Sequence, residues 1–350
     1  MDLPQVTGES SDSRLIILRN SLQNNSLPED LKKELLERVD RLVRLQQNDN
    51  FQLEFDREIE YVKFVSALPF NTSSQDVLDI KRAQQILDQR HYGLKVVKDR
   101  ILEYLSVLIL NSRQNNKSRS QVLAFVGLAG SGKTSLAYTI AESLGRKLIR
   151  IPFGGLGSVR ELRGETRLKP DAEAGIIMRS VMKLGVNNPV ILLDEIDRVS
   201  VESRADIMGV LVELLDPEQN FGYVDHYINY PFDLSKALFL ATANNTASIA
   251  TAVLDRLELI EMPSYSDEEK IVIGSKYLLP RALKEAGLPE GTVVIDEALW
   301  PTIVRPLGFD GGIRSLGRSL QSIVRKVARQ VVEGHGGPYH LTAANINQYI

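Results

Sequence analysis

One glycine-rich stretch, FVGLAGSGKTSLAYTIAESLG at residues 125–145, gives the clearest chemical signal in the sequence. Residues 127–134 fit the spacing G-x-x-x-x-G-K-[ST], with an apolar strand pattern before them and a helical pattern after them. Glycines at this spacing let backbone N–H groups close around phosphate oxygens, and the start of the helix adds a positive dipole end. We therefore predict that a nucleoside triphosphate is bound by Gly127, Gly130, Ser131, Gly132, Lys133, Thr134 and Ser135.

Two side chains of this stretch have separate expected roles. Lys133 should reach the β- and γ-phosphates of ATP, and the hydroxyl of Thr134 should bind Mg²⁺. The alternative is a glycine-rich turn that binds nothing. The order of strand, motif and helix favours the nucleotide site over that alternative.

A second pattern, VILLDEID at residues 190–197, indicates a buried strand that ends in acids. Asp194 is expected to hold Mg²⁺ through water, and Glu195 to polarise an attacking water molecule. A pair of carboxylates at this place could also be a solvated strand end. Together with the glycine-rich stretch upstream, the pair favours ATP hydrolysis over transfer of the phosphoryl group to another acceptor.

Three further side chains follow in an order that could complete such a site. FLATANN at residues 239–245 indicates another strand, and Asn244 after it is placed to contact the γ-phosphate or orient the water. Arg256 stands at the start of a further strand, and Arg314 stands at a helix start in the C-terminal helical part. Either arginine alone is more often a partner in a surface salt bridge.

The elements that must position these residues are strands and helices in alternation. Helical patterns cover residues 26–48, 55–68, 75–91 and 94–110, after about ten residues that we expect to be disordered. Apolar runs at 121–126, 147–151, 189–194, 237–242 and 257–262 then alternate with helices, which predicts an α/β fold with a five-stranded parallel sheet. From residue 264 the pattern is helical again, opening with the capping box Ser266–Glu269.

Composition excludes several classes of function. Net charge is −3, which does not indicate a nucleic-acid-binding protein. The chain has no cysteine, and its four histidines lack zinc-site spacing. The N-terminus is unlike a signal peptide, and apolar runs such as residues 104–110 are too short to span a membrane. We therefore expect a soluble cytoplasmic protein that does not bind a membrane.

Several strings resemble one known family. The order of the phosphate-binding motif, acidic strand, Asn244 and the two arginines resembles the AAA+ ATPases. Within them, HYGLKVVKDRILEYL (91–105), VNNPVILLDEID (186–197), LLDPEQNFGYVDHY (214–227) and GGIRSLGRSL (311–320) resemble the ATPase region of the Lon proteases. The resemblance runs from about residue 26 to the last residue.

This resemblance implies residue roles. Asn244 matches the family's sensor-1 asparagine, and Arg256 matches the arginine finger that serves the nucleotide of a neighbouring subunit. Arg314 matches the sensor-2 arginine, which couples the γ-phosphate to the lid. His91 and Tyr92 match the segment beside the adenine, although Tyr92 could equally be a core residue.

The resemblance also implies an architecture and an activity. The expected parts are an N-terminal helical segment at 1–70, an ATPase core at 71–263 and a small helical lid at 264–350. The expected assembly is a homo-oligomeric ring, usually of six subunits. The expected function is Mg²⁺-ATP hydrolysis that powers unfolding and translocation of unfolded or partner-presented proteins for ATP-dependent proteolysis, as in protein quality control.

The sequence departs from the family pattern at two places. It ends at ANINQYI, where the family's lid leads into a protease domain, so the expectation is either a fragment or a natural protein reduced to the motor, with peptidase activity only if that domain is supplied. The family's substrate-gripping aromatic–aliphatic pair falls on Lys169 and Pro170. A non-threading ATP-dependent ring scaffold or a stand-alone remodeller is therefore the alternative function.

Overall fold

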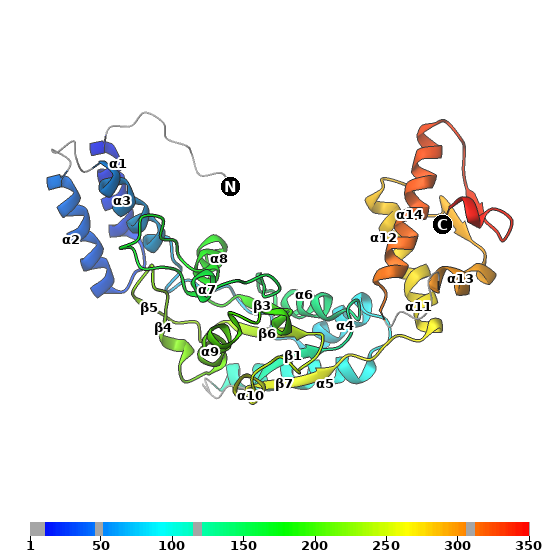
Figure 1. The fold of residues 1–350 in the computed structure, drawn as a ribbon, viewed down its shortest axis with the longest axis horizontal. Helices are drawn as coiled ribbons and strands as arrows, with labels where there is room; N and C mark the ends of the chain where they lie inside the picture. Colours follow the sequence, from blue (N-terminus) through cyan, green and yellow to red (C-terminus); the bar gives the residue numbers. More distant parts are fainter. Residues whose placement is uncertain (1–10, 46–51, 115–120, 306–311, 350) are drawn as a thin grey trace. The chain divides into compact units, whose positions relative to one another are not determined.

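Five strands form the main sheet of the structure, a computed structural model that describes residues 11–45, 52–114, 121–305 and 312–349 (Figure 1). Their order is β2-β3-β6-β1-β7, and β3 runs parallel to both β2 and β6. The predicted α/β class is confirmed, because each strand coincides with a predicted apolar run. The bounds are β1 Val122–Val126, β2 Leu148–Pro152, β3 Val190–Asp194, β6 Leu238–Ala243 and β7 Leu257–Glu261.

The helices between these strands follow the predicted alternation. Strands β3 and β6 are buried along their whole length, which is why they read as continuous apolar runs rather than alternating ones. The intervening helices are α6 Lys133–Leu144, α7 Val159–Arg163, α8 Ile176–Leu184, α9 Arg204–Leu215 and α10 Thr251–Leu254.

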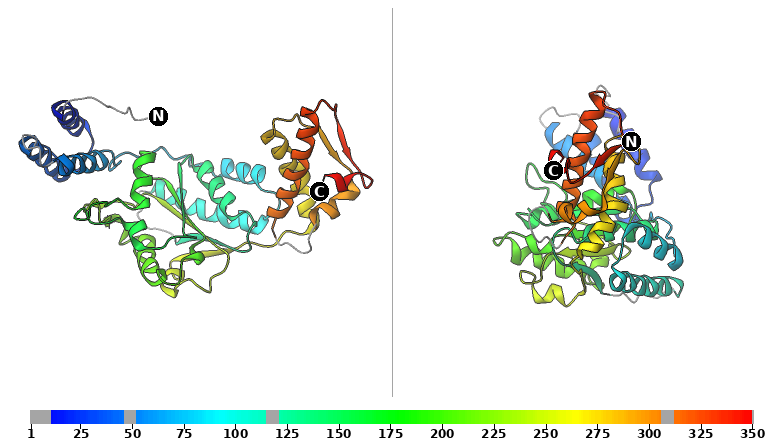
Figure 2. Two further views of the ribbon diagram at one scale, coloured as in Figure 1. Left: turned by 45° about the horizontal axis from the view of Figure 1, so that its top comes forward. Right: turned by 90° about the vertical axis from the view of Figure 1, so that its right-hand side faces the viewer.

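Three helices near the N-terminus pack on one another (Figures 1 and 2). They are α1 Ser11–Asn24, α2 Glu29–Leu45 and α3 Gln52–Ser66. Helix α1 was not predicted, whereas α2 and α3 match the two predicted helices within a few residues. The expected disorder of the first ten residues lies outside the described residues.

Helices α4 Ile80–Arg90 and α5 Lys95–Arg113 precede β1 and pack on each other. The prediction of a helix from residue 75 was wrong for residues 75–79. The helix begins later because the carboxylate of Asp79 accepts the N–H groups of Lys81 and Arg82 and so caps its first turn.

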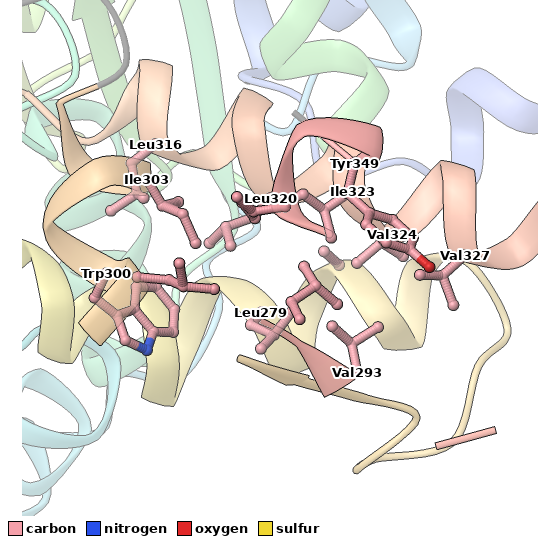
Figure 3. Packing of buried hydrophobic residues seen from close by; sticks show 14 of the residues in the cluster. Leu279, Val293, Trp300, Ile303, Leu316, Leu320, Ile323, Val324, Val327 and Tyr349 are labelled. Atoms are coloured by element: carbon pink, nitrogen blue, oxygen red, sulfur yellow. The ribbon is translucent and has the colours of Figure 1, made fainter. Parts of the chain in front are cut away.

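The C-terminal helices enclose a hydrophobic cluster of their own. Helix α11 Asp267–Ile273 opens with the predicted capping box, and a π-helical turn at Gly274–Leu278 joins it to α12 Leu279–Glu285. Helices α13 Trp300–Val304 and α14 Arg314–Val332 follow. Figure 3 shows side chains of α12, α13 and α14 meeting in this cluster, among them Trp300, Leu316 and Leu320.

Two small sheets were not predicted. Strands β4 Tyr223–Val224 and β5 Pro231–Phe232 pair antiparallel, and β8 Val293–Ile295 pairs parallel with β9 Tyr339–Leu341. Strands of two or three residues are too short to show an alternating pattern in the sequence.

Contacts between Cα atoms divide the chain into two compact units, which we describe separately. The first unit contains residues 1–77, 145–241 and 249–257, and the second contains 78–144, 242–248 and 258–350. The predicted domain boundaries at residues 70 and 263 stay predictions. Among the described residues, no helix combines the length and apolar character needed to cross a bilayer.

Candidate nucleotide-binding site

The glycine-rich stretch forms the turn between β1 and α6, and we call residues 127–134 the phosphate loop. Gly130 and Gly132 have φ angles of +84° and +95°, a region that favours glycine. A Cβ atom on Gly127 would lie 2.8 Å from the backbone oxygen of Met262. The spacing of glycines in the sequence is therefore required by the path of the backbone.

Lys133 is buried at the start of α6. Its Nζ donates to the carbonyl oxygens of Gly127 at 2.6 Å and Leu128 at 2.9 Å, and to Oδ1 of Asn244 at 3.3 Å. Asn244 follows β6, the neighbour of β1 in the sheet. The structure thus brings together two of the residues singled out from the sequence. Hydrogen bonds from an ammonium to a charged phosphate are stronger than those to carbonyl and amide oxygens, so a phosphate could replace these three acceptors.

The environment of Ser131 indicates whether the phosphate loop could bind a nucleotide. Its side chain is 1% exposed, and its Oγ has no hydrogen-bond partner among the described residues. A buried hydroxyl without a partner is unfavourable, so such groups in native proteins usually bind water or a ligand. An orphaned hydroxyl in a glycine cradle beside a buried ammonium fits a phosphate oxygen as its missing partner.

Tyr265 supports the loop from the segment before α11. Its hydroxyl donates to the carbonyl oxygen of Ser131 at 3.2 Å. Burial raises the pKa of Tyr265 to about 12, so the group is a neutral donor at physiological pH. This contact fixes the peptide that carries the orphaned hydroxyl.

The beginning of α14 lies directly on the phosphate loop, within the second unit. The N–H of Ile313 donates to the carbonyl oxygen of Gly130 at 3.1 Å, and a Cβ atom on Gly312 would lie 2.4 Å from the oxygen of Ala129. The side chain of Arg314, the first residue of α14, is exposed and makes no hydrogen bond or ion pair with any residue that the structure describes.

His91 and Tyr92 lie in different environments. His91 is buried, and its Nε2 lies 2.9 Å from Oγ1 of Thr139 on α6. Burial lowers the pKa of His91 to about 4, so the ring is neutral at physiological pH. Tyr92 is 39% exposed, so it is not a core residue and its ring can contact a ligand. Contact of either side chain with adenine stays a prediction.

The acidic end of β3 lies in the first unit. Asp194 is buried, and its Oδ2 accepts hydrogen bonds from Nε and Nη2 of Arg150 at 2.7 and 2.6 Å. Glu195 has a φ of +57°, which is uncommon for a residue other than glycine, and its Oε2 lies 3.4 Å from Nη1 of Arg198. Such backbone outliers cluster at functional sites, where neighbouring structure maintains them.

Arg256 precedes β7 and is held by two acceptors. Its Nη1 donates to the carbonyl oxygen of Ala252 at 2.8 Å, and its Nη2 donates to Oδ2 of Asp216 at 2.9 Å. Asp216 belongs to the LLDPEQN string. The two arginines of the candidate site therefore differ, because Arg256 is anchored and Arg314 is not.

Comparison with known proteins identifies the family. Residues 123–264 match the ATPase family associated with various cellular activities (AAA), and residues 284–339 match the Lon protease AAA+ ATPase lid domain. The Lon protease of Lawsonia intracellularis is 42% identical over 340 residues, which are 97% of this chain and 40% of that protein. The Lon proteases of Roseiflexus castenholzii and Fusobacterium nucleatum are 39% and 38% identical over 98% and 97% of this chain.

The chain belongs to the AAA+ ATPases of the Lon family. It spans 40 to 44% of the length of these three relatives and corresponds to their ATPase region. Family membership implies nucleotide binding, in agreement with the fit of the phosphate loop.

A second loop of this Lon-family ATPase, residues 164–175, is fixed at its base. Asp225 is buried, and its Oδ2 accepts the N–H of Gly175 at 2.7 Å while its Oδ1 accepts the N–H of Tyr227 at 2.8 Å. Burial raises the pKa of Asp225 despite these donors. Arg167 adds an anchor, because its Cζ lies 3.7 Å from the ring centroid of Tyr61 on α3.

The tip of the 164–175 loop is exposed. Leu168 is 94% exposed, and Lys169 Nζ lies 3.1 Å from Oε1 of Glu165. That hydrogen bond lowers the pKa of Glu165, so this carboxylate is ionised at neutral pH. The tip therefore carries an internal carboxylate that offsets the lysine charge.

Sequence reasoning missed four residues that support the candidate site. Tyr265, Arg150 and Asp216 each contact a predicted residue from a distant part of the sequence, and Asp225 holds the base of the 164–175 loop. The strings DPEQN and DHY, which carried the family resemblance, contain Asp216 and Asp225, and this was the only signal that could have pointed to them.

Proposed function

We propose that this chain is a Mg²⁺-ATP-hydrolysing motor module that acts on protein substrates. The observation that carries the proposal is the phosphate loop, where buried Lys133, Asn244 and the orphaned hydroxyl of Ser131 surround a turn that only glycines can form. Such a constellation binds a triphosphate. The family of the chain supports hydrolysis as the outcome.

Each predicted residue has one role in this proposal. Thr134 and Asp194 supply hard oxygen donors, which Mg²⁺ prefers. The metal, when bound, neutralises charge on the phosphates. Glu195 accepts a proton from the attacking water, and Asn244 orients that water. His91, Tyr92 and Ser135 belong to the nucleotide-binding residues.

The proposed assembly is a cytoplasmic homo-oligomeric ring, of about six subunits by analogy with the family. Arg256 would then contribute to the nucleotide site of a neighbouring copy, and Arg314 would report the γ-phosphate to the lid. We further propose a helical segment at 1–70, an ATPase core at 71–263 and a lid at 264–350. In a full-length relative the motor would feed unfolded or partner-presented proteins to proteolysis.

A steady-state ATPase assay of the purified chain tests this function. Turnover should require Mg²⁺, and specific activity should rise with protein concentration, because a site that needs Arg256 from another copy is incomplete in the monomer. Adding a chemically unfolded polypeptide should raise turnover. Absence of hydrolysis at every concentration, with nucleotide still bound, would remove the motor function.

The alternative function is a ring scaffold that assembles on ATP and does not thread protein. Lys169 and Pro170 at the exposed loop tip favour it, because a cation and a rigid ring give little apolar grip. A scaffold should assemble on ATP and hydrolyse it slowly, with no stimulation by unfolded polypeptide. Stimulation of severalfold or more would instead support the motor.

A further inference from the structure

The anchoring of Arg256 has a specific geometry, within the first unit. A guanidinium has five N–H donors in one plane. Here one donor of Nη1 is used by the carbonyl oxygen of Ala252, one donor of Nη2 by Asp216, and Nε is buried without a partner among the described residues. One donor on each Nη atom is left, on a side chain that is 27% exposed.

Asp216 is itself held rigidly. It caps the C-terminus of α9, its Oδ1 accepts the N–H of Glu218 at 2.9 Å, and its Oδ2 accepts Nε2 of Gln219 at 3.0 Å. The bond from the Glu218 N–H, together with the one from Arg256, lowers the pKa of Asp216. The carboxylate is therefore ionised at neutral pH, and its position is set by a turn rather than by the arginine.

An arginine held in this way is suited to bind a phosphate. Two parallel N–H donors match two phosphate oxygens, and a side chain that is already ordered loses little entropy on binding. A free arginine at the same position would have to be ordered at the moment of reaction. The ion pair with Asp216 thus orients Arg256, in the same way that outer-shell hydrogen bonds orient the ligands of a metal.

We propose that Asp216 is a positioning residue that holds the guanidinium of Arg256 ready for the nucleotide of a neighbouring copy. This inference rests on the proposed function, in which Arg256 acts between subunits. Asp216 does not touch the nucleotide, so its loss should lower the rate of hydrolysis and leave nucleotide affinity unchanged.

Two substitutions separate positioning from folding. Asp216→Asn keeps an oxygen for the Glu218 N–H but removes the charge that pairs with Arg256, whereas Asp216→Ala removes both. We expect kcat to fall about 10-fold in the first and about 100-fold in the second, as for groups that orient a ligand. The affinity for a fluorescent ATP analogue should not change.

Asp233→Asn is the matched control. Asp233 Oδ1 accepts the N–H of Ser235 at 2.8 Å in a similar turn of the same unit, and no arginine among the described residues pairs with it. This control should have wild-type kcat, and its thermal unfolding midpoint should match that of Asp216→Asn. A fall in kcat that is equal in the control, or that follows a lowered midpoint in Asp216→Asn, would assign Asp216 a purely structural role.

Mixing subunits decides where Asp216 acts. Asp216→Ala and Glu195→Gln subunits are each expected to be poor ATPases alone. In mixed assemblies, an intact Glu195 from the first type can meet an intact Asp216–Arg256 pair from the second, so activity should return. No recovery would overturn the inference, because it would place Asp216 in its own subunit's site.

Arg256→Ala separates failure of this inference from failure of the proposed function. If Arg256→Ala keeps wild-type turnover, the proposed role of Arg256 between subunits is wrong. If Arg256→Ala is nearly inactive while Asp216→Ala keeps wild-type kcat, the role of Arg256 stands and Asp216 is not its positioning residue.

Discussion

The phosphate loop and the 164–175 loop differ in how much of their length is held by contacts with other residues. The phosphate loop follows β1 and the 164–175 loop follows α7, and both contain glycines that their backbones require. The phosphate loop is fixed throughout, with Gly130 bonded to Ile313, Ser131 bonded to Tyr265, and the ammonium of Lys133 on its carbonyl oxygens. The 164–175 loop is fixed only at its base, and its tip is exposed.

The two loops are therefore expected to tolerate different substitutions. Backbone atoms make the contacts in the phosphate loop, so its residue spacing cannot change without loss of the turn. In the 164–175 loop the close approach is confined to the base, where a Cβ atom on Gly175 would lie 1.9 Å from the carbonyl oxygen of Leu162. Side chains at the tip are exposed, so substitutions there should disturb the loop less than substitutions at its base.

The largest expected effect lies at the phosphate loop. Lys133→Ala deletes the charge on the phosphates, so nucleotide affinity and turnover should both be lost. Glu195→Gln provides the contrast: it should bind ATP normally and hydrolyse it about 10²–10⁴-fold more slowly, because only the proton acceptor is removed. Isothermal titration and a steady-state ATPase assay measure the two quantities. Near-full turnover in Glu195→Gln would remove Glu195 from the mechanism.

A substitution at the base of the 164–175 loop should lower the free energy of unfolding. Gly175→Ala forces the chain away from the oxygen of Leu162, which should lower the free energy of unfolding by at least about 3 kcal/mol. Gly209→Ala is the control, because Gly209 lies inside α9 with open space around it. That control should stabilise by about 0.5–1 kcal/mol. Denaturant unfolding checks both, and equal effects would mean that the base is not rigid.

The packing of α6, which begins in the phosphate loop, should contribute less to the stability of the protein at acid pH. Helix α6 starts in this loop and carries Thr139, the partner of buried His91. The pKa of His91 is about 4 in the folded state against 6.5 for the free side chain. The unfolded state therefore binds the proton first, so this contribution to stability is present above pH 6.5 and is lost as pH falls towards 4.

The expected loss from His91 is about 2 kcal/mol between pH 7 and pH 5. His91→Gln keeps a polar group beside Thr139 but cannot be charged, so it should lose that much less over the same range. Thermal unfolding of both proteins at a series of pH values checks this. Parallel curves for the two proteins would show that His91 is not the origin of the acid sensitivity.

Some residues of the candidate site could be predicted from the sequence and others could not, for a physical reason. Lys133, Thr134 and Asn244 follow apolar runs at fixed spacings, because strand ends and the helix start determine their positions. Tyr265 and Asp225 support those positions through contacts that join segments far apart in the chain, and no local pattern encodes such contacts.

The elements of the fold also differed in how well the sequence predicted them. The five main strands have the length and apolar character that a sequence pattern needs. The strands β8 and β9, three residues each, are defined only by pairing between residues 293–295 and 339–341. The helix predicted from residue 75 begins at Ile80 because the side chain of Asp79 competes for its first N–H groups.

The smallest expected effect lies at the loop tip. If the tip faces the axis of a ring, Lys169 from every copy would surround one channel, and like charges there would repel. The structure reduces that repulsion, because Lys169 is paired with Glu165 in the same loop. Pro170 lacks a backbone donor and has a fixed φ, which limits how the tip could close on an extended peptide. We therefore expect weak unfolding of apolar substrates.

The double change Lys169→Tyr, Pro170→Ile would give the tip an aromatic and an aliphatic side chain. Basal ATPase activity should stay at the wild-type level, because the tip is remote in sequence from the phosphate loop and makes none of its contacts. Stimulation by an unfolded polypeptide should rise, by about twofold to fivefold if each new apolar contact contributes about 0.5 kcal/mol. Lys169→Arg is the control, since it keeps the charge and should change neither rate. If the wild-type protein already unfolds a stable, neutral tagged substrate rapidly, the tip does not limit how strongly the loop holds a polypeptide. The contrast between a fixed base and a weakly binding tip would then be wrong.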